Sequence, residues 1–281
     1  TLDVDGGTIK LDGNYPVGTG NVALGNTALD DGSLSGGYNT AIGNEALTAN
    51  TSGSVNVAVG QGTLYLNTTG QSNVAVGGNA MADNTTGNYN TAIGRYALTD
   101  NTTALNNTAV GYQAGYSNTT GDQNTFVGAE AGDAINTGRR NTALGMASLT
   151  TDTKGDLSVA VGFGALNGQN FTSSTEAYNT AVGALAGAAI TTGIGNTLIG
   201  GLAGDALTDA DYNVAIGREA LTSDTLGSRS VAIGQHALQV QNFTSATNTY
   251  NVAIGYDAGV SVTTGIENTL IGGLTGDALT V

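Results

Sequence analysis

The chain of 281 residues contains no cysteine and no tryptophan, one proline, one histidine and only seven basic residues. The absence of cysteine excludes disulfides, thiolate metal sites and thiol nucleophiles. With 22 acidic residues and a net charge of −15, the chain lacks the basic patch that nucleic acid requires, so we expect no nucleic-acid partner. No apolar run approaches the roughly 18 residues of a membrane-spanning helix, which predicts no membrane insertion in this segment.

The sequence also offers little for catalysis, which needs several matched side chains in one place. His236 is the only histidine, and it occupies a position whose residue type varies from repeat to repeat, so we expect it to be a solvated surface residue. With one histidine and no cysteine, neither a zinc site nor a nucleophile–base pair can be assembled. We therefore predict a protein that is not an enzyme, without catalytic residues, metal or cofactor.

What the chain does contain is a repeated five-residue phrase, Asn–Thr/Val–Ala–Ile/Val/Leu–Gly. Its closing glycine occurs 15 times between Gly25 and Gly272, and 11 of the 14 intervals are 17 residues long. The first position is Asn in 13 copies and Ser in the other two, Ser158 and Ser230. A fixed period of this kind indicates stacked structural units rather than a reused active site.

The phrase is typical of a short β-strand, because a run rich in β-branched residues stops at a glycine. Its apolar residues also lack the 3.6-residue spacing of an amphipathic helix. We expect each unit to contain this strand, a glycine corner, a second short strand and a polar turn. Stacking such units gives an all-β fold, a parallel β-solenoid of about 15 coils. The solenoid is predicted over residues 21–281, and residues 1–20, which lack the phrase, are predicted to form a β lead-in or connector.

Equivalent residues of successive coils should lie about 4.8 Å apart, so that each position of the repeat forms a column. The first position then predicts a buried ladder of asparagine amides in which each side chain bonds its neighbours. The residues we assign to this structural ladder are Asn39, Asn56, Asn73, Asn90, Asn107, Asn124 and Asn141.

Both faces of the predicted strand are apolar, since the third position is Ala, Leu or Phe and the fourth is always Ile, Val or Leu. A strand that is apolar on both faces is usually covered on both. One cover is the interior of the coil, and thin coils have little core of their own. A second copy of the chain, related to the first by symmetry around the long axis, is the simplest source of the other cover.

Two four-residue insertions interrupt the period, within residues 167–178 and 239–250, and a 72-residue super-repeat relates them. They contain the aromatic residues Phe171, Tyr178, Phe243 and Tyr250. Two interpretations stay open. The aromatic rings pack over the neighbouring coil, or the loops form a contact surface that recurs along the molecule.

Several stretches resemble known fibre repeats. "SVAVGFGAL" at Ser158 and "SVAIGQHAL" at Ser230 resemble the head repeat of trimeric autotransporter adhesins. "GYNTAIGNEAL" and "NTAVGYQAGYSNTTGDQNTFVGAEAG" are similar to repeats of phage tail-fibre and bacterial surface-fibre proteins. The likeness covers residues 21–281. It implies a left-handed β-roll, three chains around one axis, and an extracellular location on a virion tail fibre or a bacterial cell surface. It also implies attachment to a host or surface receptor, for which a glycan is one candidate.

We therefore expect a non-enzymatic shaft or head segment of a trimeric fibre, which supplies length and rigidity. One alternative is an ice-binding solenoid, since eight of the 15 second positions are Thr and the other seven are Val. The other is a carbohydrate-active enzyme on a β-helix scaffold, which requires carboxylates and aromatic rings on neighbouring coils.

Overall fold

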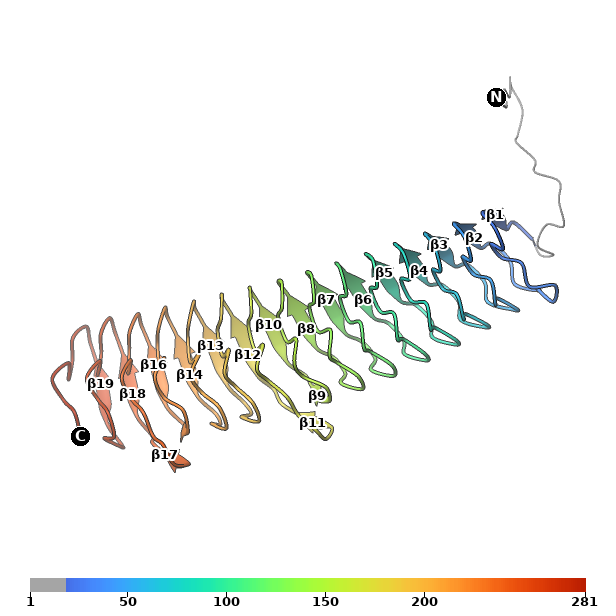
Figure 1. Cartoon of the computed structure of the whole chain (residues 1–281). Helices are drawn as coiled ribbons and strands as arrows, with labels where there is room; N and C mark the ends of the chain where they lie inside the picture. The colour runs from blue at the N-terminus through green and yellow to red at the C-terminus, as the bar shows by residue number, and fades with distance from the viewer. Residues whose placement is uncertain (1–18) are drawn as a thin grey trace, which may run out of the picture.

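In the computed structural model, residues 19–281 form an elongated stack of coils with one strand of each coil aligned along the same side (Figure 1). The described residues contain strands and turns but no helix, and the predicted lead-in at residues 1–20 lies almost wholly outside them. Fifteen three-residue strands pair in chain order into one sheet, and four two-residue strands form two small sheets. The large sheet comprises β1 (Val22–Leu24), β2 (Thr40–Ile42), β3 (Val57–Val59), β4 (Val74–Val76), β5 (Thr91–Ile93), β6 (Thr108–Val110), β7 (Thr125–Val127), β8 (Thr142–Leu144), β10 (Val159–Val161), β12 (Thr180–Val182), β13 (Thr197–Ile199), β14 (Val214–Ile216), β16 (Val231–Ile233), β18 (Val252–Ile254) and β19 (Thr269–Ile271). The small sheets pair β9 (Gly155–Asp156) with β11 (Thr175–Glu176), and β15 (Gly227–Ser228) with β17 (Thr247–Asn248).

Each strand of the large sheet is parallel to its neighbours and pairs with the equivalent residues of the next coil. Ala58 of β3, for example, pairs with Ala75 of β4, which lies one 17-residue coil further along the chain. The prediction of an all-β parallel solenoid with about 15 coils of 17 residues is therefore confirmed. At about 4.8 Å per coil, the stack is roughly 70 Å long.

Alternate residues of a strand point to opposite sides, and the two sides of this sheet differ in burial. The third position points into the coil, where Ala92 of β5 is fully buried. The second and fourth positions point outward: in the same strand Thr91 is half-buried and Ile93 is 41% exposed. The coil itself therefore covers one apolar face of each strand and leaves the other face open.

The prediction of a second short strand after the glycine corner is wrong. The residues after Gly43 form a turn in which Glu45 and Leu47 adopt left-handed backbone conformations, with φ of 60° and 54°. The left-handed residues turn the backbone sharply within a short coil. Hydrogen bonds between coils are still made, since the N–H groups of Glu45 and Leu47 donate to the carbonyl oxygens of Asn26 and Thr63 at 2.9 and 3.0 Å.

This geometry explains one column of the repeat, the fourth residue after the closing glycine. It holds Leu, Met or Gly in every coil and never Val or Ile, because β-branched side chains tolerate positive φ poorly. Where the residue is Leu or Met, as at Leu47 and Met81, the side chain is fully buried in the coil. Burial of this side chain offsets the backbone strain.

In the coils that carry Gly in this column, a large side chain from another position of the repeat fills the interior. Phe126 takes the place of the usual Ala at the third position of β7, and its ring occupies the space that side chains at Gly115 and Gly132 would need. Leu198 lies in the same way beside Gly187 and Gly204. The interior thus keeps its packing density by exchanging a large residue between two columns, as close packing of a protein core requires.

Eleven of the 13 asparagine residues at the first position are buried, including all seven that the sequence analysis assigned to the ladder, and the other two, Asn21 and Asn268, lie in the end coils. Most of their hydrogen bonds reach the backbone. Asn56 donates from Nδ2 to the carbonyl oxygen of Gly70 at 2.8 Å, and its Oδ1 accepts the backbone N–H of Asn73 in the next coil at 3.0 Å. Direct bonds between amide side chains occur in only some coils, for example from Asn73 to Asn56 at 3.2 Å. Each asparagine therefore ties its own turn to the strand of the following coil.

A second buried asparagine column, which the sequence analysis missed, runs through the turns. Its Nδ2 atoms donate to the Oδ1 of the preceding coil, at 2.7 Å from Asn84 to Asn67 and at 2.7 Å from Asn101 to Asn84. The column ends at Asn118, whose buried Oδ1 has no hydrogen-bond partner, because the next coil places Ile135 there. Its members are Asn50, Asn67, Asn84, Asn101 and Asn118.

Candidate functional site

The most extensive exposed feature of the described chain is the outer face of the large sheet. Two columns form its centre: Thr or Val at the second position, and Ile, Val or Leu at the fourth. Two further columns border it: the residue before each asparagine and the residue after each closing glycine. We call these four columns together the apolar strip.

The strip gathers most of the large hydrophobic side chains that the single chain leaves exposed. Of the 23 such side chains among the described residues, 17 belong to its four columns. The flanking columns are rich in aromatic residues, and Tyr38 is 66% exposed. The exposed large residues of the two flanks are Tyr38, Val55, Tyr89, Tyr178, Tyr212 and Tyr250 on one side, and Tyr112, Met146, Phe163 and Tyr256 on the other. Monomeric soluble proteins rarely leave a continuous apolar surface of this extent uncovered.

Charge is distributed unevenly between the strip and the rest of the surface. Although the chain contains 22 acidic residues, Glu267 is the only one in the four columns. The four columns contain four of the five arginines of the chain, Arg95, Arg140, Arg218 and Arg229. Tyr, Phe, Met and Arg are the residues enriched at protein–protein interfaces, where acidic residues are depleted.

The insertions form two arms that extend from the coils on the side away from the large sheet, at β9 and β11 and at β15 and β17 (Figure 1). The predicted contact residues divide into two kinds. Phe171 and Phe243 are buried, which fits the interpretation that these rings pack over the neighbouring coil. Tyr178 and Tyr250 are exposed and lie in a flanking column of the apolar strip rather than at the tips of the arms.

Each arm is anchored by a buried polar cluster. Asp152 accepts the backbone N–H of Phe171 at 3.1 Å and the Nε2 of Gln169 at 2.6 Å. The same amide contacts Ser158 Oγ at 2.9 Å, while Asn179 Nδ2 donates to the Oε1 of Gln169. The second arm repeats the arrangement with Asp224, Gln241, Ser230 and Asn251. Ser158 and Ser230 replace asparagine at the first position of the repeat. In these two coils the side-chain amide of Gln169 or Gln241 takes the place of the missing asparagine amide.

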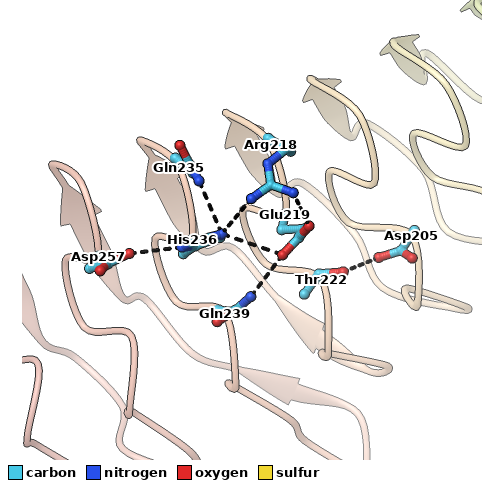
Figure 2. Close-up of polar contacts among 8 residues, drawn as sticks. All are labelled: Asp205, Arg218, Glu219, Thr222, Gln235, His236, Gln239 and Asp257. Carbon is cyan, nitrogen blue, oxygen red and sulfur yellow. Dashed lines mark hydrogen bonds and ion pairs between the residues drawn. The ribbon is translucent and has the colours of Figure 1, made fainter.

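His236 lies in a polar cluster that joins three successive coils (Figure 2). Its Nδ1 lies 2.9 Å from Asp257 Oδ1, and its Nε2 lies 3.2 Å from Arg218 Nη2 and 3.4 Å from Glu219 Oε2. The imidazole side chain is 19% exposed, so His236 lies at the surface but is partly covered by its neighbours. The cluster has no hydroxyl or thiol next to the imidazole that could act as a nucleophile.

A few carboxyl groups have altered acidity. Burial raises the pKa of Asp100, and the neighbouring carboxylate of Asp83 raises it further. Burial likewise raises the pKa of Asp133, although a hydrogen bond from Thr150 opposes the shift. Among residues 19–281, no three His, Asp or Glu side chains come together in a way that could hold a metal ion.

The chain was compared with protein-family models, with curated proteins and with solved structures, and none of the three comparisons gave a match. In the described part of the chain, no helix could cross a lipid bilayer.

Proposed function

We propose that the chain is a non-enzymatic structural segment of an extracellular fibre, in which three copies associate along their apolar strips. This proposal rests mainly on the strip itself, a predominantly apolar surface that contains a single acidic residue in a strongly acidic chain. We propose three copies because the repeat resembles the repeats of trimeric fibre proteins. A phage tail fibre or a bacterial surface fibre is the setting that this resemblance favours.

The dimensions of the strip support association. Fifteen coils at about 4.8 Å, each with seven residues from one flanking column to the other and thus six steps of about 3.3 Å, define a surface on the order of 1,000 Å². Stable interfaces bury about 800 Å² on each partner, so the strip is large enough. The two flanking columns differ in sequence, so an arrangement around one axis would place unlike flanks of neighbouring copies against each other.

The coils support a mechanical role. Each coil is linked to the next by strand pairing, by buried asparagine side chains and by threonine hydroxyls such as Thr68, which donates to the carbonyl oxygen of Thr85 at 3.1 Å. Bonds of this kind recur along most of the described chain. A rod with repeated internal links resists bending and exposes few loops to proteases.

The ice-binding alternative uses the same surface, since the threonines at the second position lie on the outward face. Ordering of water favours a flat, regular face, whereas the flanks carry protruding Tyr, Phe, Met and Arg side chains. These flanks favour a protein partner instead.

The arms extend away from the strip and would remain free in an assembly of three copies. They are the places where a receptor or glycan would be sought.

A charge placed in the middle of the strip tests this proposal. Val110 is the fourth residue of its repeat and points outward from β6, so Val110→Glu would bring several buried carboxylates together in an assembly. We expect this variant to be a folded monomer. Thr103→Glu, in an exposed turn away from the strip, is the matched control and should assemble like the parent chain. Unchanged assembly of Val110→Glu would refute the strip as the interface.

A further inference from the structure

His236 lies in the turn after β16, and its contacts come from the turns after β14 and β18 (Figure 2). Arg218 and Glu219 belong to the first of these turns and Asp257 to the second. The sequence contains no other histidine. Imidazole is the side chain whose charge ordinarily changes between about pH 5 and 8, so His236 is the natural place for a proton-controlled event.

The contacts define which nitrogen carries the proton when the ring is neutral. Arg218 Nη2 and Gln235 Nε2 are both obligate donors, and each lies 3.2 Å from His236 Nε2. Nε2 must therefore accept. The opposite nitrogen, Nδ1, lies 2.9 Å from the carboxylate of Asp257 and donates to it. The neutral ring is thus held in its Nδ1–H form.

A protonated ring cannot keep this arrangement. An Nε2–H group can no longer accept from Arg218, and two adjacent cations repel each other. Glu219 Oε2 lies 3.4 Å from the same Nε2 and becomes the favourable partner. We infer that His236 is a proton-operated switch that exchanges Arg218 for Glu219 as the partner of its Nε2 atom.

The other groups around the ring are consistent with this exchange. The charged neighbours are one guanidinium, Arg218, and two carboxylates, Glu219 and Asp257. Gln239 holds Glu219 Oε2 at 3.0 Å, and the Tyr256 ring lies 6.1 Å from the imidazole. A proton on His236 balances the excess negative charge of this cluster.

The exchange changes the border of the apolar strip. Arg218 belongs to the column after the closing glycine, and its side chain is 58% exposed. In the neutral state it is held by Glu219 at 2.7 Å and by the imidazole. In the protonated state it gives up the imidazole and shares Glu219 with it, so the guanidinium becomes free to move. The switch is a property of one chain and does not depend on the proposed assembly.

Nitrogen NMR of uniformly ¹⁵N-labelled protein tests the first half of the inference, because a single histidine gives a single imidazole spin system. At about pH 8 we expect the Nδ1–H form, which is the minor form of a free neutral histidine side chain. Asp257→Ala removes the acceptor of the Nδ1–H group and should raise the share of the Nε2–H form, although Arg218 and Gln235 still donate to Nε2. Glu130→Ala, at the equivalent position of another coil, is the matched control and should leave the ring unchanged. An Nε2–H ring in the parent protein would overturn the inference.

The second half is tested by the side-chain Nε–H signal of Arg218 at about pH 8 and about pH 5.5. The exchange of guanidinium N–H groups with solvent is itself slower at lower pH, so the Arg218 rate is compared with that of Arg229. We expect the ratio of the Arg218 rate to the Arg229 rate to rise at the lower pH in the parent protein and to stay the same in His236→Gln. Arg229, which donates to Asn248 at 2.9 Å, serves as an internal control in the same spectra. A ratio that is identical at both pH values in the parent protein would refute the exchange of partners.

Discussion

The ring of Phe126 fills the space beside Gly132 that a leucine side chain occupies in most other coils. Phe126 and Gly132 belong to the same coil, so a large residue on the strand is matched by an absent side chain in the turn. The pairing recurs at Leu198 with Gly204 and at Leu270 with Gly276. It shows that a large residue on the strand takes the interior space of the turn side chains that are missing from its own coil and from the coil before it.

A double-mutant cycle on Phe126 and Gly132 tests this exchange. Phe126→Ala should cost about 3–5 kcal/mol of stability, because it leaves a cavity in a fully buried site. Gly132→Leu alone should also destabilise, because its side chain meets the ring. The double variant restores the common pattern and should be more stable than either single variant, since residue 132 has a φ of 58° and Leu47 accepts 54°. Denaturant unfolding measures all four proteins, and strictly additive losses would contradict a shared volume.

The buried asparagines at the first position of the repeat predict a second effect on the stability of the fold. Asn73→Ala removes the donor to Gly87 and the acceptor for the Asn90 N–H, so buried backbone groups lose their partners. We expect a loss on the order of 3 kcal/mol in urea unfolding. Thr86→Ala, at an exposed turn position, is the control and should change stability little. Equal effects of the two substitutions would show that the buried amide bonds do not hold the coils together.

The acidity of Asp100 predicts a dependence of stability on pH. Burial and the Asp83 carboxylate raise its pKa in the folded chain, so the fold disfavours the charged form. Stability therefore falls as pH rises through the folded-state pKa, and it is regained as pH falls toward the unfolded value of about 3.9. Asp100→Asn should raise the midpoint of thermal unfolding at neutral pH and give no gain below that unfolded value.

The pKa of Asp31 is shifted in the opposite direction to that of Asp100, and thermal unfolding at several pH values tests this shift as well. Hydrogen bonds from Ser33 lower the pKa of Asp31, so its charged form is favoured in the folded chain. Asp31→Asn should therefore lower the unfolding midpoint at neutral pH, and its effect should disappear in acid. A shift of the same sign for both substitutions would contradict the assigned causes.

The sequence was sufficient to predict the solenoid because its period is so regular. Columns of like residues, such as Ala58 over Ala75, left one register for the strands. Burial of the first-position asparagines also followed from the repeat, because an amide recurring every 17 residues in an apolar strand needs a recurring partner. The partner itself, mainly backbone, required coordinates.

Other features were hidden from the sequence for physical reasons. Residues such as Glu45 and Leu47 ordinarily avoid positive φ, so their pattern indicated a strand where the chain makes a left-handed turn. The second asparagine column lies in turns, where asparagine is common and carries little information about burial. The surroundings of His236 depend on side chains from three coils, which no local pattern shows.

The mass of the chain in solution tests the central claim most directly. Sedimentation equilibrium or native mass spectrometry should give three times the 27.7 kDa of one chain, and Val110→Glu should return that mass to 27.7 kDa. A parent protein that stays at 27.7 kDa at every accessible concentration would contradict the claim that other copies cover the apolar strip. A mass of two chains would contradict the threefold arrangement.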